Sequence, residues 1–338
     1  MNNLLKVASQ IPLGVPKQTV VINPVILHPE FRSVPLELSI TMPVQGRGLP
    51  IILLSHGDGP SLYLPSKDGY TPLANFYAEQ GFVVIQPTHA NSKVAGLAHS
   101  EAGAPLFWHM RVLEMKHILD SLSIIERITP LLAGRLDHQR IAAVGHSMGG
   151  QTIGMLLGAR LTNPANAQEI DVNVLEPRVK AGVLLAPPGN GGEELSAFAK
   201  ENFPELNPDY SYLTTQSLCV VGSEDLNPFM TVRGPEWYRA AYEHGPGCEY
   251  LLSLTGGQHG LGGIAGYDAK ETADEDPDRL AIVQRLTAAY LKTALYEDDP
   301  SWRDACQVLL TKASHLARLE TKLSKDVLEF SNTQEPAR

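Results

Sequence analysis

Three side chains that could together activate a hydroxyl group lie far apart along the sequence: Ser147, Asp225 and His259. A serine hydroxyl becomes a strong nucleophile when a histidine removes its proton, and that histidine needs a carboxylate to hold its tautomer. Ser147 lies in Gly145–Gly149 (GHSMG), which matches the pattern Gly-x-Ser-x-Gly. The chemistry expected of this group is attack on a carbonyl carbon through a covalent acyl intermediate.

The surroundings of Ser147 support this interpretation. The apolar run Arg140–Gly145 predicts a strand before it, and Met148–Arg160 has a helical pattern after it. A sharp strand-to-helix turn strains the serine backbone and needs small neighbours on both sides, which the flanking glycines provide. We therefore predict Ser147 as the nucleophile and a structural role for His146. An ordinary glycine-rich turn is the alternative.

The acid and the base are predicted from chain order, which in this arrangement is serine, carboxylate, histidine. The strand predicted at Ser217–Gly222 runs into Asp225, which we prefer to Glu224 because Gly-x-x-Asp before a proline-containing turn is the usual arrangement. The alternative is that both carboxylates are ordinary solvent-exposed side chains of a loop. His259 lies between glycines after the strand predicted at Glu249–Leu254, so we predict it as the base.

Two backbone N–H groups are expected to stabilise the oxyanion that forms during acyl transfer. One is that of Met148, directly after the nucleophile. The other is that of Asp58, in the loop after the strand predicted at Pro50–Ser55, with Gly57 as second choice. The Asp58 carboxylate should point outward, away from the developing anion. An ordinary glycine turn is the alternative.

An apolar acyl or alcohol group suits the residues expected around the cleft. The residues predicted to bind substrate are His56, Gly57, Phe107, Trp108 and Pro187. A place in the core is the alternative for Phe107 and Trp108. No His, Asp or Glu cluster shows a metal-ligand spacing such as His-Glu-x-x-His, so the sequence implies no metal and no cofactor.

Alternating strand and helix patterns predict an α/β fold with a mostly parallel central sheet flanked by helices. The predicted strands are Leu36–Met42, with one half-exposed face, Pro50–Ser55, Phe82–Gln86, Arg140–Gly145, Val179–Ala186, Ser217–Gly222 and Glu249–Leu254. The predicted helices are Thr71–Gln80, Leu106–Ala133, Met148–Arg160, Gly234–His244 and Pro277–Leu295, the last with Asp276 as its N-cap. One catalytic domain is expected at 35–297, with an N-terminal extension at 1–34 and a C-terminal helical extension at 298–338.

Two segments depart from this alternation. Residues 187–215 are rich in Pro, Gly, Asn and Glu, and we expect a small insertion that leans over the active-site face. The tail from Ser301 is expected to be an extra helix, because Leu309, Leu316, Leu323 and Phe330 recur every seven residues. Its apolar stripe is expected to pack on its own domain, and a homodimer contact is the alternative.

The composition is that of a globular protein, with 43% hydrophobic and 19% charged residues among 338. A net charge of −10 without a basic run argues against nucleic acid as a partner. No apolar run is long enough to span a membrane, and Met1–Pro16 lacks the pattern of a secretory signal. Three unpatterned cysteines favour buried thiols in a reducing compartment, so we expect a cytoplasmic protein.

Four motifs resemble the α/β-hydrolase superfamily: SHGDG at 55–59, GHSMGG at 145–150, GSED at 222–225 and GGQHG at 256–260. Over roughly residues 35–297 the chain is similar to the branch of dienelactone hydrolases, platelet-activating-factor acetylhydrolases and chlorophyllases. The 55–59 loop resembles the oxyanion loop of the acetylhydrolases, which supports Asp58. Chlorophyllases usually carry Arg after the serine where this chain has Met148, which argues against chlorophyll as a substrate.

This resemblance implies a serine esterase that acts on a small-molecule carboxylic ester. Acyl transfer, or hydrolysis of a lactone, thioester or amide, would use the same three side chains and is the first alternative. A catalytically silent binding protein is the second.

Overall fold

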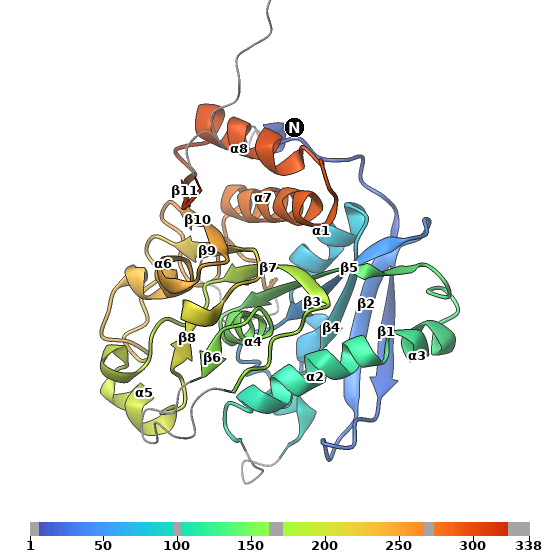
Figure 1. Ribbon diagram of the computed structural model, residues 1–338, viewed down its shortest axis with the longest axis horizontal. Coiled ribbons are helices and arrows are strands. Elements are labelled where there is room, and N and C mark those ends of the chain that lie inside the picture. The colour runs from blue at the N-terminus through green and yellow to red at the C-terminus, as the bar shows by residue number, and fades with distance from the viewer. Residues whose placement is uncertain (1–6, 98–102, 162–171, 267–273, 324–338) are drawn as a thin grey trace, which may run out of the picture.

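A computed structural model describes residues 7–97, 103–161, 172–266 and 274–323 of the chain. Its centre is a nine-stranded sheet with the order β1-β2-β4-β3-β5-β7-β9-β10-β11 (Figure 1). The strands are β1 (Thr19–Leu27), β2 (Leu36–Pro43), β3 (Leu49–Ser55), β4 (Val83–Pro87), β5 (Leu136–His146), β7 (Val179–Leu185), β9 (Ser217–Gly222), β10 (Cys248–Leu254) and β11 (Ala317–Thr321).

The sheet is parallel through its middle and antiparallel at its two edges. β4, β3, β5, β7, β9 and β10 run in one direction, whereas β1 and β2 pair antiparallel, β2 is antiparallel to β4, and β11 is antiparallel to β10. The strands β3, β4, β7 and β9 are buried along almost all of their length, as expected where helices cover both faces of a sheet. This confirms the predicted α/β fold with a large, mostly parallel sheet flanked by helices.

The helices form a layer on each face of the sheet. They are α1 (Thr71–Glu79), α2 (Trp108–Asp120), α3 (Leu122–Ile128), α4 (Met148–Leu156), α5 (Ala197–Asn202), α6 (Ala240–His244), α7 (Pro277–Leu295) and α8 (Ser301–Lys312). In Figure 1, α7 and α1 lie on one side of the sheet, with α8 packed outside α7, and α2 and α4 lie on the other. Parallel strands with crossovers of this kind bring their carboxyl ends to one edge.

Most predicted elements are present, and the differences have local causes. The helix predicted over Leu106–Ala133 is wrong as a single element, because it breaks at Ser121 into α2 and α3. Gly234–His244 is likewise a five-residue 3-10 helix followed by the short α6. The half-exposed face predicted for Leu36–Met42 is also wrong: Ser39 and Thr41 are buried, so β2 is covered on both faces.

The C-terminal tail is not one helix. The helix α8 ends at Lys312, and residues 317–321 form β11, which pairs with β10. Leu309 is buried in α8, whereas Leu316 and Leu319 pack against the core from outside that helix. The seven-residue spacing therefore continues by coincidence past the helix end, and Phe330 lies outside the described residues. β1 and β11 extend the sheet beyond the predicted limits 35–297.

The segment 187–215 contains α5 and a short strand, β8 (Pro208–Asp209), which pairs with β6 (Arg160–Leu161) after α4. Tyr210 in this segment is buried and donates a hydrogen bond to the carbonyl of Pro188 at 2.6 Å.

Among the helices of the described residues, none is long and apolar enough to cross a lipid bilayer.

Candidate active site

Ser147 occupies a strained turn between β5 and α4. Its backbone has φ 55° and ψ −121°, a conformation that few non-glycine residues adopt. The flanking glycines have no room for a side chain: a Cβ atom on Gly145 would lie 2.1 Å from the carbonyl oxygen of Gly149, and one on Gly149 would lie 2.1 Å from that of Ser55. The turn therefore needs both glycines, as the sequence pattern predicts.

The structure brings the three predicted side chains together in one row. His259 Nε2 lies 2.9 Å from Ser147 Oγ, and His259 Nδ1 lies 2.8 Å from Asp225 Oδ2. Since the carboxylate can only accept, Nδ1 carries the proton and Nε2 can accept the serine proton. Asp225 is 1% exposed, whereas Glu224, the other candidate acid, is exposed to solvent. Ser147, His259 and Asp225 come from the carboxyl ends of β5, β10 and β9.

The imidazole of His259 is held between two other rings. Its centroid lies 4.8 Å from that of His146 and 5.3 Å from that of Tyr238. Burial, and then the charge of Asp225, raises the pKa of the Tyr238 hydroxyl, which stays neutral. In the loop that carries His259, the backbone N–H of Gln258 donates a hydrogen bond to Asp274 Oδ2 at 2.7 Å. The base therefore sits on a loop with several fixed points.

His146 links the base loop to the loop after β3. Its Nε2 donates to the carbonyl of His259 at 2.8 Å, so its Nδ1 accepts from the Tyr70 hydroxyl at 2.6 Å. The Tyr70 oxygen in turn accepts from the Gly57 N–H at 3.2 Å. This is the structural role predicted for His146. Burial, and then the nearby charge of His259, lowers its pKa to about 3, so the ring is neutral.

The burial of His146 should make the fold sensitive to acid. The pKa of His146 in the unfolded chain is about 6.5, so below pH 6.5 the unfolded state binds a proton that the folded state does not bind. Stability present above pH 6.5 is therefore lost as pH falls toward 3, by roughly 1.4 kcal/mol per pH unit from this group. In urea unfolding between pH 7 and 4.5, the free energy of unfolding should fall as pH falls. The slope of this free energy against pH gives the number of protons bound on unfolding, and His146→Gln should reduce that number by about one. An identical slope in the two proteins would contradict this.

The amides predicted for the oxyanion hole are placed differently from one another. The Gly57 N–H is already bonded to Tyr70, which disfavours this second choice. The N–H groups of Asp58 and Met148 donate to none of the residues that the structure describes. Asp58 has an exposed side chain, as expected, and its carbonyl accepts from Asn91 Nδ2 at 2.5 Å. These two amides therefore remain the candidates for an oxyanion hole.

The side chains predicted to bind substrate have different surroundings. His56 is buried, with Nδ1 donating to the Gly57 carbonyl and Nε2 accepting from the His89 N–H, so its ring is engaged by the backbone. Phe107 is 4% exposed at the start of α2, which favours the core alternative. Trp108 is half-buried, and its indole donates to Glu205 in the 187–215 segment at 3.0 Å.

Pro187 is buried beside the first turn of α4, where its Cα lies 3.0 Å from a Cβ placed on Gly150. The start of the predicted insertion is thus packed next to the helix that follows the serine.

A cluster of buried charged residues behind the site was not predicted. Arg111 and Glu114 of α2 are 0% exposed, and Glu114 bonds Arg32 Nη1 and His89 Nδ1 at 2.5 and 2.6 Å. Burial raises the pKa of Glu114 to about 7, against the opposing effect of the arginines. A signal existed in the sequence: Arg111 falls on the same helical face as the apolar Met115 and Ile118.

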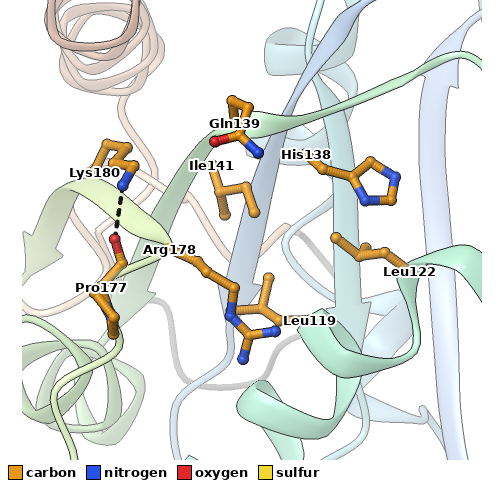
Figure 2. Close-up of a pocket in the computed structure, with 8 residues that line it drawn as sticks. All are labelled: Leu119, Leu122, His138, Gln139, Ile141, Pro177, Arg178 and Lys180. Carbon is orange, nitrogen blue, oxygen red and sulfur yellow. Dashed lines mark hydrogen bonds between the residues drawn. The ribbon is translucent and has the colours of Figure 1, made fainter.

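A separate hollow of about 410 Å³ lies at the other edge of the sheet (Figure 2). Its lining residues are Leu119, Leu122, His138, Gln139, Ile141, Pro177, Arg178 and Lys180. They come from α2, from α3, from the amino-terminal half of β5 and from the start of β7 with the residues before it, whereas Ser147 follows the carboxyl end of β5. Arg178 is paired with Glu176 and Asp120, and His138 with Glu126. This hollow is therefore not part of the candidate active site.

Within the described ranges, no three His, Cys, Asp or Glu side chains are grouped so that they could hold a metal ion.

No protein-family model matches the sequence, and a search of curated proteins finds no match.

Proposed function

We propose that this chain is a serine hydrolase of the α/β-hydrolase fold that cleaves carboxylic esters. The observation that carries the proposal is the hydrogen-bonded row of Ser147, His259 and Asp225, with distances of 2.9 and 2.8 Å. The three loops that hold these residues follow the parallel strands β5, β9 and β10, in the order serine, acid, histidine. Nucleophile, base and orienting acid at such distances are the arrangement that acyl transfer requires.

The proposed reaction begins when Ser147 Oγ attacks the ester carbonyl carbon while His259 Nε2 takes the hydroxyl proton. The oxyanion that forms is stabilised by the amides of Asp58 and Met148 and by the positive end of α4. His259 then protonates the leaving alcohol, and the acyl group remains on Ser147. Water, activated by the same imidazole, attacks the acyl-enzyme and releases the acid. Asp225 stabilises the imidazolium through both steps.

Two alternatives remain beside ester hydrolysis. Acyl transfer and hydrolysis of lactones, thioesters or amides pass through the same acyl-enzyme, so products formed with competing alcohols must discriminate between them. A binding protein without catalysis is disfavoured by the Ser147–His259 hydrogen bond, which such a protein does not need. We propose an ester with a moderately apolar acyl or alcohol group.

Labelling with a fluorophosphonate tests the proposal directly. The reagent phosphonylates only a serine that is activated by a base, so the native chain should be labelled within minutes and the acid-unfolded chain should not. Peptide mass spectrometry should locate the adduct on Ser147. A native chain that stays unlabelled, or one labelled at another serine, would contradict the proposed function.

A further inference from the structure

The buried guanidinium of Arg111 lies against the loop that follows β3. Arg111 is in the first turn of α2, and its side chain is completely enclosed. Nη2 donates to the His56 carbonyl at 2.5 Å, and Nη1 donates to the Gly57 carbonyl at 3.3 Å. A cation buried in the interior costs free energy unless several acceptors surround it, so this placement needs a reason.

The remaining donors of Arg111 tie the loop to three other elements. Nε donates to Thr152 Oγ1 of α4 at 2.8 Å, and Nη2 to Ser55 Oγ at the end of β3 at 3.1 Å. Nη1 also donates to Asn91 Oδ1 at 2.5 Å, and Asn91 passes the contact on to the Asp58 carbonyl. The guanidinium therefore holds three successive loop carbonyls, two directly and one through Asn91.

Fixing these carbonyls also fixes the amides. A trans peptide unit is planar, with its C=O and the following N–H pointing in opposite directions. The Gly57 carbonyl is held from behind by Arg111 and by His56 Nδ1 at 2.8 Å. The N–H of the same peptide unit belongs to Asp58, so it is turned away from the guanidinium. A Cβ on Gly57 would lie 3.5 Å from Ser147 Cβ, which places this loop beside the nucleophile.

We propose that Arg111 is a positioning residue, which orients the Asp58 N–H for the oxyanion by holding the carbonyls of His56 and Gly57. This role rests on the proposed function and adds a residue to it. Preorganised donors stabilise a transition state because they need no reorganisation during the reaction. Arg111 thus acts on the rate of acylation rather than on substrate affinity.

Arg111→Lys and Arg111→Gln variants test this role with p-nitrophenyl butyrate as the substrate. A lysine keeps the charge, but it has three donors on one nitrogen in place of five on a planar fork, so it cannot bond all five acceptors at once. We expect kcat per site titrated with fluorophosphonate to fall roughly 10- to 100-fold, with KM changed less than about threefold. The inhibition constant of a trifluoromethyl ketone, which forms a tetrahedral oxyanion on the serine, should rise by the same factor as kcat falls.

Arg32→Gln is the matched control. Arg32 is a second buried arginine, bonded to Glu114 and to the Thr88 carbonyl, but among the described residues it forms no hydrogen bond or ion pair with residues 56–58. Its loss should lower the thermal midpoint while kcat per titrated site stays within about twofold. Should both Arg111 variants fail to fold, Asn91→Ala removes the second acceptor of Arg111 Nη1, the nitrogen that holds the Gly57 carbonyl, together with the bond to the Asp58 carbonyl, and it should still lower kcat about three- to tenfold.

Unchanged kcat per titrated site in the folded Arg111 variants, or in Asn91→Ala when those do not fold, would overturn the positioning role alone. An equal loss in Arg32→Gln would do the same, since it would show a general effect of the buried charges. A wild-type chain that is neither labelled nor active would overturn the proposed function, and this role with it.

Discussion

Replacement of Ser147 by alanine should lower the rate of p-nitrophenyl butyrate hydrolysis by roughly 10⁵- to 10⁶-fold. The methyl side chain has no oxygen to form the acyl bond, so the covalent path is lost. The residual rate should come only from binding and from the oxyanion hole. The fold should be preserved, because the turn depends on Gly145 and Gly149 and on the Ser147 amide, which donates to the Leu185 carbonyl at 2.8 Å.

His259→Ala and the double variant with Ser147→Ala make this prediction sharper. The effects of residues that act as one unit do not add. The rate of the double variant should therefore lie within about threefold of the rate of either single variant. Ser123→Ala is the matched control, because Ser123 is an exposed serine of α3, away from the three loops of the site, and its activity should remain within about twofold. Activity above background in Ser147→Ala would remove the basis for the proposed function.

Replacement of Asp225 by asparagine should lower kcat about 10⁴-fold. Asparagine has nearly the same shape, but its amide can donate to His259 Nδ1 and so favours the tautomer in which Nε2 carries the proton. An imidazole in that form cannot accept the proton of Ser147. Because Asp225 is 1% exposed, water cannot replace the lost acceptor. The measurement is kcat at pH 8, with the thermal midpoint recorded to show that the variant is folded.

Glu224→Gln provides the control for Asp225→Asn. It makes the same chemical change one residue earlier in the same loop, at an exposed side chain, and should leave kcat within about twofold. If Glu224→Gln instead caused the large loss while Asp225→Asn stayed active, the acid would be Glu224. That result would place the working conformation of this loop far from the one described.

The identity of the candidate site residues could be predicted from the chain alone because their constraints are local. Gly145 and Gly149 are required within one turn by steric exclusion at 2.1 Å, and such exclusion leaves a pattern over five residues. Apolar runs such as Leu49–Ser55 mark strands buried on both faces, and the end of each run marks a loop at the same edge of the sheet. The order of these loops pointed to Glu224 or Asp225 as the acid and to His259 as the base, and the Gly-x-x-Asp pattern then favoured Asp225.

The parts that depend on partners distant in sequence were decided only by the tertiary structure. Arg111 donates to carbonyls more than fifty residues away, and Glu114 pairs with Arg32, which lies 82 residues earlier in the chain. The same holds for the edge strand β11. Its sequence continues the apolar spacing of a helix, but its residues form a strand because they pair with β10. Local periodicity records which face of an element is buried, but it does not record what is buried against it. Burial of a charge is tolerable only when specific acceptors converge on it, and that convergence is a property of the fold.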